Sequence, residues 1–138
     1  MFRNLTKAAV LMAVAFAVLA FDPSSADAHG KGQKVTKLMK APLSDAAGKV
    51  ARVVRFEVGP NWVSKRHTHP GDLFVYVTKG VLTIIVDGDD PREIGPGQVF
   101  HEKPGKPMTA RNLSSEKGAT FIIFQVGKDG EPLMVPVK

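Results

Sequence analysis

Turn-forming residues interrupt this chain at short, regular intervals, and this spacing limits the folds that it can adopt. The interruptions contain Gly, Pro, Asn or Asp, and they fall at residues 42–48, 59–61, 79–80, 87–91, 95–97, 103–107 and 113–118. The segments between them are mostly too short for helices of ordinary length. Short segments between frequent turns are typical of all-β sandwiches and barrels. The 13 Gly and 10 Pro in 138 residues fit that class better than a helical bundle.

The segments between the turns have the side-chain pattern of strands. In residues 50–58, Val54, Phe56 and Val58 share one parity, whereas Arg55 and Glu57 lie on the other. This alternation predicts a half-buried strand. Similar reasoning predicts about eight strands in a single domain. They are expected at residues 35–40, 50–58, 73–77, 81–86, 98–102, 108–112, 119–126 and 132–137, after a polar lead at 29–34.

The N-terminal segment has the pattern of a secretory signal peptide. Arg3 and Lys7 precede an apolar run at residues 8–21, and small residues follow at Ala26 and Ala28. The run is shorter than the roughly 20 residues of a membrane-spanning helix. We therefore expect a signal peptide at 1–28, a mature domain at 29–138 without a stable membrane anchor, and a periplasmic or secreted protein. Cleavage after Ala28 or Ala26 would place His29 near the new N-terminus, where it could bind Cu(II) with the terminal amine.

Composition excludes several classes of function. The chain contains no Cys, which removes disulfides, Cys metal sites and thiol catalysis. Its net charge of +6 comes from scattered basic residues, and only one Trp and one Tyr are available for base stacking. We therefore expect no nucleic-acid partner and interpret the charge as a solvated surface.

The segment His67-Thr68-His69 is the main candidate for chemistry. Residues i and i+2 of a strand face the same side, so both imidazoles would point in one direction. Neutral imidazole is a ligand for Zn, Cu, Fe and Ni. The pair therefore predicts the beginning of a metal or ligand site.

Two longer stretches around these residues resemble the signature motifs of the cupin superfamily. The stretch from Gly59 to Gly80, which contains His67-Thr68-His69-Pro70-Gly71, resembles the first motif. The stretch from Gly97 to Asn112 resembles the second. The resemblance implies a single-domain cupin, which is a jelly-roll barrel or double-stranded β-helix. It further implies a homodimer, a small-molecule ligand and a divalent transition metal inside the barrel.

The chain departs from these motifs at the metal ligands. Leu73 stands where the family usually has a ligand Glu, and Met108 stands where it has its third ligand His. Lys103 replaces the family Pro, and Gly59 lies two residues too far from His67. Of the usual four ligands only two histidines are present, so a three-His, one-Glu site is not expected.

Three other residues could complete the site. His101 and Glu102 are neighbours on one predicted strand, so only one of them can face inward. The resemblance favours Glu102, as a ligand or as the catalytic base. With His67 and His69 it would suit Fe, Zn or Mn. Met108 as a thioether ligand, or His101 as a third imidazole, would instead favour Cu. The expected apolar walls are Phe100, Tyr76 and Phe124.

Three functions remain open at this point. The first is a metal-dependent enzyme that acts on a small organic molecule as an oxygenase, isomerase or lyase. The second is a non-catalytic, copper-binding protein of the cell envelope. The third is a metal-free cupin that binds a small ligand. Turnover with a bound metal, tight Cu(I) binding without turnover, and full stability without metal would distinguish them in that order.

Overall fold

The structure is a computed structural model that describes residues 32–138. The predicted signal peptide and His29 lie outside the described residues. The described part contains strands and turns and no helix. Its ten strands are β1 (Gln33–Pro42), β2 (Lys49–Val58), β3 (His67–Thr68), β4 (Asp72–Lys79), β5 (Leu82–Val86), β6 (Arg92–Ile94), β7 (Val99–Glu102), β8 (Met108–Arg111), β9 (Ala119–Lys128) and β10 (Val135–Pro136).

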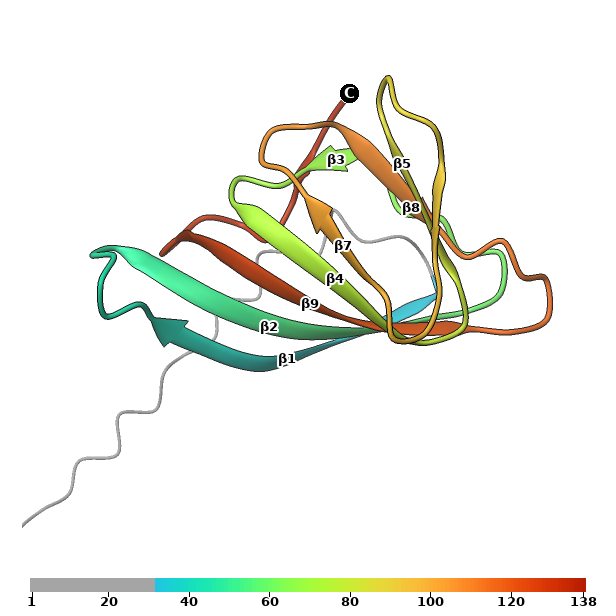
Figure 1. The fold of residues 1–138 in the computed structure, drawn as a ribbon, viewed down its shortest axis with the longest axis horizontal. Coiled ribbons are helices and arrows are strands. Elements are labelled where there is room, and N and C mark those ends of the chain that lie inside the picture. The colour runs from blue at the N-terminus through green and yellow to red at the C-terminus, as the bar shows by residue number, and fades with distance from the viewer. Residues whose placement is uncertain (1–31) are drawn as a thin grey trace, which may run out of the picture.

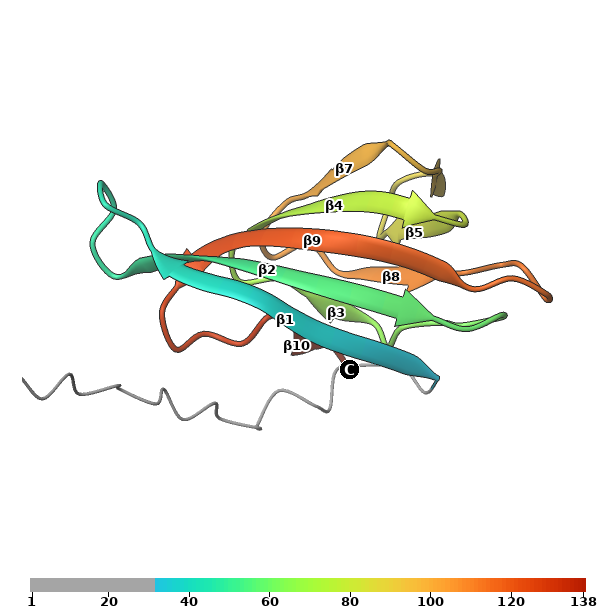
Figure 2. The same ribbon diagram turned by 90° about the horizontal axis from the view of Figure 1, so that it is seen from below.

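The strands form two five-stranded antiparallel sheets (Figure 1). The first has the order β1-β2-β9-β4-β7 and the second the order β10-β3-β8-β5-β6. Figure 2 shows the long strands of the first sheet side by side, with the strands of the second behind them. The predicted all-β jelly-roll fold is confirmed. No helix within residues 32–138 is long and apolar enough to cross a membrane.

Alternation along the strands decides which side chains enter the space between the sheets. Leu73, Val75 and Val77 of β4 are almost fully buried, whereas the intervening Tyr76 is 38% exposed. Phe124 of β9 is 47% exposed for the same reason. The expectation that Tyr76 and Phe124 line the site is therefore wrong, because their parity places them on the outer face. Only Phe100 of the three expected wall residues packs against the core.

The strand register arranges the inward side chains in rows across the first sheet. Gln125, Leu73 and Glu102 are successive partners in one row, on β9, β4 and β7. Phe121 lies four residues from Gln125 along β9, which at the rise of a strand is about 13 Å. The row of Phe121 is therefore well separated from the row of Glu102, and the barrel interior has two distinct ends.

Strand boundaries differ from the prediction mainly at the periphery. β1 begins at Gln33, not 35, and it continues to Pro42, which was expected in a turn. β6 was not predicted, because its three residues follow a run rich in Gly, Asp and Pro. Both strands lie at a sheet edge, where one side lacks a neighbour and the apolar pattern is weaker.

Candidate functional site

A cavity of about 30 Å³ lies between the two sheets. Its polar side chains include both predicted histidines and Glu102, and its remaining lining is mostly apolar. The volume suffices for a metal ion with one or two water molecules. The lining comprises Gln33, Phe56, Trp62, Ser64, His67, His69, Leu73, Val75, Leu82, Glu102, Ala110, Phe121, Ile123 and Met134.

The two histidines face each other inside this cavity. His67 belongs to β3, and His69 follows two residues later, so both side chains lie on the inner side. They are 4% and 2% exposed. Their Nε2 atoms are 3.2 Å apart, and the rings meet edge to face at 85°. The structure therefore brings the predicted pair together and turns their Nε2 atoms toward each other.

Glu102 reaches His69 from the other sheet. Its carboxylate Oε2 lies 3.0 Å from Nε2 of His69, and the side chain is buried. The neighbouring His101 points outward, where it contacts Asp72 at 2.8 Å and stacks on Phe74 at 4.6 Å. Alternation along β7 thus places Glu102 inside and His101 outside, so His101 cannot join the cavity donors.

Met108 lies close to the histidines in the sheet but not in the cavity lining. It is the antiparallel partner of His67 across β3 and β8 and is 1% exposed. Its side chain belongs to the hydrophobic cluster and is absent from the residues that line the cavity. The structure gives Met108 the packing role that Met commonly has in irregular cores.

Hydrogen bonds to backbone carbonyls set the tautomer of both histidines. Nδ1 of His67 lies 2.7 Å from the Lys65 carbonyl, and Nδ1 of His69 lies 2.8 Å from the Leu133 carbonyl. A carbonyl oxygen only accepts, so each Nδ1 carries the hydrogen and donates. In the neutral rings both Nε2 atoms therefore present lone pairs. This is the arrangement that metal-binding histidines usually have.

The result is a cluster of acceptors without a donor between them. Two Nε2 lone pairs and one carboxylate oxygen meet at 3.2 and 3.0 Å. Such a contact is repulsive unless a positive charge lies between the atoms. A proton shared by His69 and Glu102, or a metal cation, would provide that charge.

The electrostatics of His67 favour its neutral form. Burial lowers the pKa of His67 below its ordinary value of 6.5, and the neighbouring His69 acts in the same direction. The Lys65 carbonyl and Glu102 oppose this shift. Neutral imidazole is the form that binds metals, so the lowered pKa keeps Nε2 of His67 available near neutral pH.

The nitrogen and oxygen atoms of these three side chains are suitable ligands for a transition metal, although they do not form a complete metal site. Two imidazole nitrogens and one carboxylate are ligands that Fe, Zn and Mn accept. Within residues 32–138, no group of three or more His, Asp or Glu side chains has the arrangement of a complete metal site. The three groups form a row in which His69 contacts both of the others, instead of a triangle around one point.

Sequence reasoning missed several residues around this site. Gln125 is fully buried, and its Nε2 donates to the Leu133 carbonyl at 2.9 Å, the same oxygen that His69 uses. A signal existed, because Gln125 is the polar member of the inward run Phe121, Ile123, Gln125. Trp62, the only Trp, and Gln33 also line the cavity. Gln33 lies 34 residues before His67 in the sequence, whereas Trp62 lies only five residues before it.

Comparison with known proteins identifies the family. Residues 54–124 match the cupin domain, which is half of the chain, so the protein belongs to the cupin family. No curated protein matches it.

Solved structures share the fold at low sequence identity. A cupin-like protein from Thermotoga maritima is 16% identical with a TM-score of 0.60, covering 78% of this chain and 79% of its own. The DMSP lyase DddQ from Ruegeria pomeroyi is 18% identical with a TM-score of 0.63, and the match covers 77% of this chain and 52% of the DddQ chain. The polyketide cyclase RemF from Streptomyces resistomycificus is 22% identical with a TM-score of 0.59, and the match covers 93% of this chain and 87% of the RemF chain.

Proposed function

We propose that this cupin binds a single divalent transition-metal ion through His67 Nε2, His69 Nε2 and the Glu102 carboxylate, and that it acts on a small organic molecule. The observation that carries the proposal is the cluster of three acceptor atoms without a hydrogen-bond donor between them. Three acceptor atoms from two sheets meet in a buried space, and backbone carbonyls fix the tautomer of both rings. A metal cation satisfies all three acceptors at once, whereas a shared proton satisfies fewer of them.

The cavity chemistry favours Fe, Zn or Mn over Cu. Nitrogen and carboxylate oxygen are the donors in the cavity, and the thioether of Met108 lies outside its lining. A soft sulfur ligand is the feature that would have favoured copper. A metal held by three protein ligands keeps open positions, where it would polarise a substrate oxygen or bind dioxygen.

The protein itself contributes orientation and exclusion of water. The Lys65 and Leu133 carbonyls hold the two rings, and the apolar lining limits the number of water molecules in the cavity. Glu102, if released from the metal, is the buried carboxylate within reach for proton transfer. The structural neighbours include a lyase and a cyclase of small molecules, which supports a small-molecule substrate for this chain.

Metal analysis tests the proposal. The protein, purified and then supplied separately with Fe(II), Zn(II), Mn(II) and Cu(II), is measured by elemental mass spectrometry. We expect stoichiometric metal in the wild type and its loss in His67→Ala and His69→Ala. The matched control is His101→Ala, which removes an exposed His from β7 and should leave the metal content unchanged. Equal metal content in wild type and His69→Ala would refute the site.

We further propose that residues 1–28 direct export and are removed. Intact-mass measurement of protein from the exported fraction tests this, with a start at Asp27 or His29 as the expected result. A protein that stays inside the cell with Met1 intact would contradict it.

A further inference from the structure

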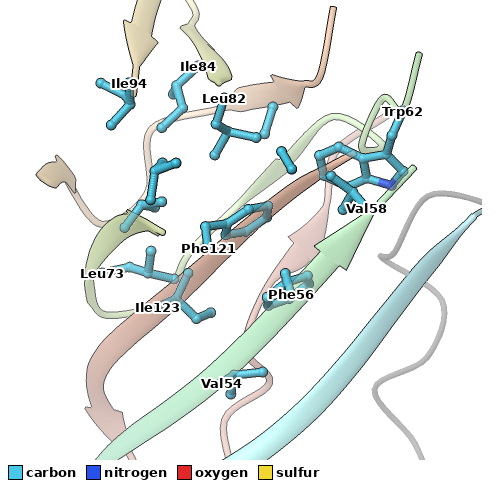
Figure 3. Packing of buried hydrophobic residues seen from close by; sticks show 14 of the residues in the cluster. Val54, Phe56, Val58, Trp62, Leu73, Leu82, Ile84, Ile94, Phe121 and Ile123 are labelled. Atoms are coloured by element: carbon cyan, nitrogen blue, oxygen red, sulfur yellow. The ribbon is translucent and has the colours of Figure 1, made fainter. Parts of the chain in front are cut away.

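Gln125 on β9 is a fully buried amide with a hydrogen-bond partner at each end. Its Oε1 accepts from Nη1 of Arg52 at 3.1 Å, and its Nε2 donates to the Leu133 carbonyl at 2.9 Å. Figure 3 shows Phe121 and Ile123 of the same strand pointing into the hydrophobic core, and Gln125 is the next residue of that parity. An apolar side chain could fill this position without the cost of burying an amide. The two hydrogen bonds are therefore what distinguishes Gln125 from its apolar neighbours.

The carbonyl to which Gln125 donates is the one that orients His69. The Leu133 oxygen accepts from Gln125 Nε2 at 2.9 Å and from His69 Nδ1 at 2.8 Å. A carbonyl oxygen has two lone pairs and can accept both hydrogen bonds. Leu133 lies outside the strands, between β9 and β10, so no sheet ladder fixes its carbonyl. The donor from Gln125 holds this oxygen from the side of β9.

Arg52 determines which way the amide of Gln125 points. The two residues are partners across β2 and β9, so their side chains lie on the same face of the sheet. A guanidinium only donates and a carbonyl only accepts. The amide must therefore turn its oxygen to Arg52 and its NH₂ to Leu133. The second guanidinium nitrogen of Arg52 donates to the Lys128 carbonyl at 2.9 Å, which anchors the guanidinium to the end of β9.

These contacts connect a half-buried arginine to the acceptor cluster without a gap. Arg52 donates to Gln125, and Gln125 and His69 both donate to the Leu133 carbonyl. Nε2 on the other side of the His69 ring lies 3.0 Å from Glu102. A change at Arg52 or Gln125 can thus reach the ring without touching any residue of the acceptor cluster.

We propose that Gln125 is a positioning residue for His69 and that Arg52 acts through Gln125. Gln125 holds the Leu133 carbonyl where it accepts from Nδ1, and this keeps Nε2 of His69 as the acceptor in the cluster. The inference rests on the proposed function for its effect on metal binding. Its effect on the tautomer of His69 depends on the hydrogen bonds alone.

Two variants of the full chain each remove one link. Gln125→Met keeps the approximate length of the side chain but has neither the donor nor the acceptor. Arg52→Met removes the guanidinium at a half-buried position and leaves Gln125 in place. The matched control is Arg55→Met on the same strand, because Arg55 has the opposite parity and contacts Glu57 at 3.3 Å on the surface. Circular dichroism checks that each variant is folded.

The first measurement is the tautomer of His69 in metal-free protein. Nitrogen NMR of labelled histidine shows which ring nitrogen carries the hydrogen, and at pH 8 imidazole is ordinarily neutral. We expect hydrogen on Nδ1 in the wild type and in Arg55→Met, and a mixture of both tautomers in Gln125→Met. A role in packing alone would lower stability and leave the tautomer unchanged. If Gln125→Met does not fold, a mixture in Arg52→Met supports the inference and a wild-type spectrum overturns it.

The second measurement is Zn(II) affinity by competition with a chelator. We expect a loss of about 10-fold in Gln125→Met and of about 3-fold in Arg52→Met. Because Arg52 acts through Gln125, adding Arg52→Met to Gln125→Met should cause no further loss. Additive losses would overturn the role of Arg52.

The outcomes separate this inference from the proposed function. A wild-type tautomer and a wild-type Zn(II) affinity in folded Gln125→Met would overturn the inference and leave the metal site intact. A mixture of tautomers in Gln125→Met, together with a wild type that takes up no metal, would refute the proposed function and leave the positioning role intact.

Discussion

Two backbone carbonyls determine what the imidazoles of His67 and His69 can do. By accepting from Nδ1, the Lys65 and Leu133 carbonyls leave Nε2 of each ring as an acceptor. The rings could not adopt the other neutral tautomer without leaving a buried carbonyl facing a lone pair. Side-chain identity alone therefore does not define this site, because the chemistry depends on which ring nitrogen carries the hydrogen.

The lowered pKa of His67 predicts how stability changes with pH. Below about 6.5 the unfolded chain binds a proton that the folded imidazole resists, so the free energy of unfolding falls as the pH falls through this range toward the lower folded-state pKa. We expect the free energy of unfolding of His67→Gln to change less with pH in this range. Urea unfolding of metal-free protein at pH 7.5, 6.5 and 5.5 measures the difference. Parallel curves for the two proteins would contradict the assignment.

Replacing Glu102 by Gln should separate stability from metal binding. The amide NH₂ of Gln can donate to Nε2 of His69, which supplies the donor that the metal-free cluster lacks. We expect the metal-free variant to be at least as stable as the wild type, with a free energy of unfolding higher by up to about 1 kcal/mol. Metal affinity should fall by about 10- to 100-fold. Denaturation and metal competition measure these two quantities, and a large loss of stability would count against the acceptor cluster.

At the scale of the element, the turn between the histidines and β4 depends on close backbone contact. A Cβ on Gly71 would lie 2.1 Å from the Val126 carbonyl oxygen and 2.9 Å from the Gly127 Cα, both backbone atoms of β9. Gly71 thus lets the chain pass directly over β9 between His69 and Leu73. This contact explains why Gly stands at this position of the motif.

Gly71→Ala should therefore be strongly destabilising. We expect a loss of more than about 2 kcal/mol, because backbone atoms of β9 would have to move. Gly95→Ala is the control, since its nearest contact would be a side-chain atom of Gln98 at 3.6 Å. It should change stability by less than about 0.5 kcal/mol. Chemical denaturation of both variants compares them, and equal midpoints would refute the contact.

The sequence predicted central elements better than peripheral ones. Strands β2, β4 and β9 have strong apolar alternation because both their neighbours and one buried face constrain them. Edge strands β1 and β6 are less constrained, so the bounds of β1 were missed and β6 was not predicted. Alternation along β7 predicted that only one of His101 and Glu102 faces inward. The resemblance to cupins, and not the alternation, favoured Glu102. Tyr76 and Phe124 were expected in the site but lie on the outer face, because their parity is opposite to that of the buried residues of β4 and β9.

Contacts between distant segments could not be read from the sequence. The Leu133 carbonyl meets His69 because β10 pairs with β3. Leu133 and His69 are 64 positions apart in the sequence. The convergence of Gln33 and Trp62 on one cavity depends on the register of β1 with β2. Neither register has a local sequence signature, so these parts of the site required the structure.

At the scale of the whole molecule, the outer face of the first sheet has an exposed apolar patch. The patch consists of Phe74, Tyr76, Val99 and Phe124, which are neighbours through the pairs Phe74–Phe124 and Tyr76–Val99. Contiguous apolar surface of this kind commonly marks an interface. A two-fold axis through the patch would let a second copy cover it with the same residues.

We therefore expect a homodimer that depends on this patch. Phe124→Lys places a charge within the patch and should shift the protein to a monomer. Leu113→Lys is the matched control, because Leu113 is an exposed apolar residue in a loop outside the patch. Light scattering after size-exclusion chromatography gives the mass of each species. A wild-type monomer, or a dimer that survives Phe124→Lys, would contradict this interface.

The bond from His69 to the Leu133 carbonyl also has a consequence for biogenesis. The carbonyl that orients this imidazole belongs to a residue 64 positions later in the chain, after β9, so it leaves the ribosome well after His69. A nascent chain can pair most of its strands earlier, but its His69 ring lacks this partner until Leu133 has been synthesised. If the proposed metal site exists, its second imidazole would be oriented only once Leu133 is in place, and a product clipped before Leu133 would lack that orientation.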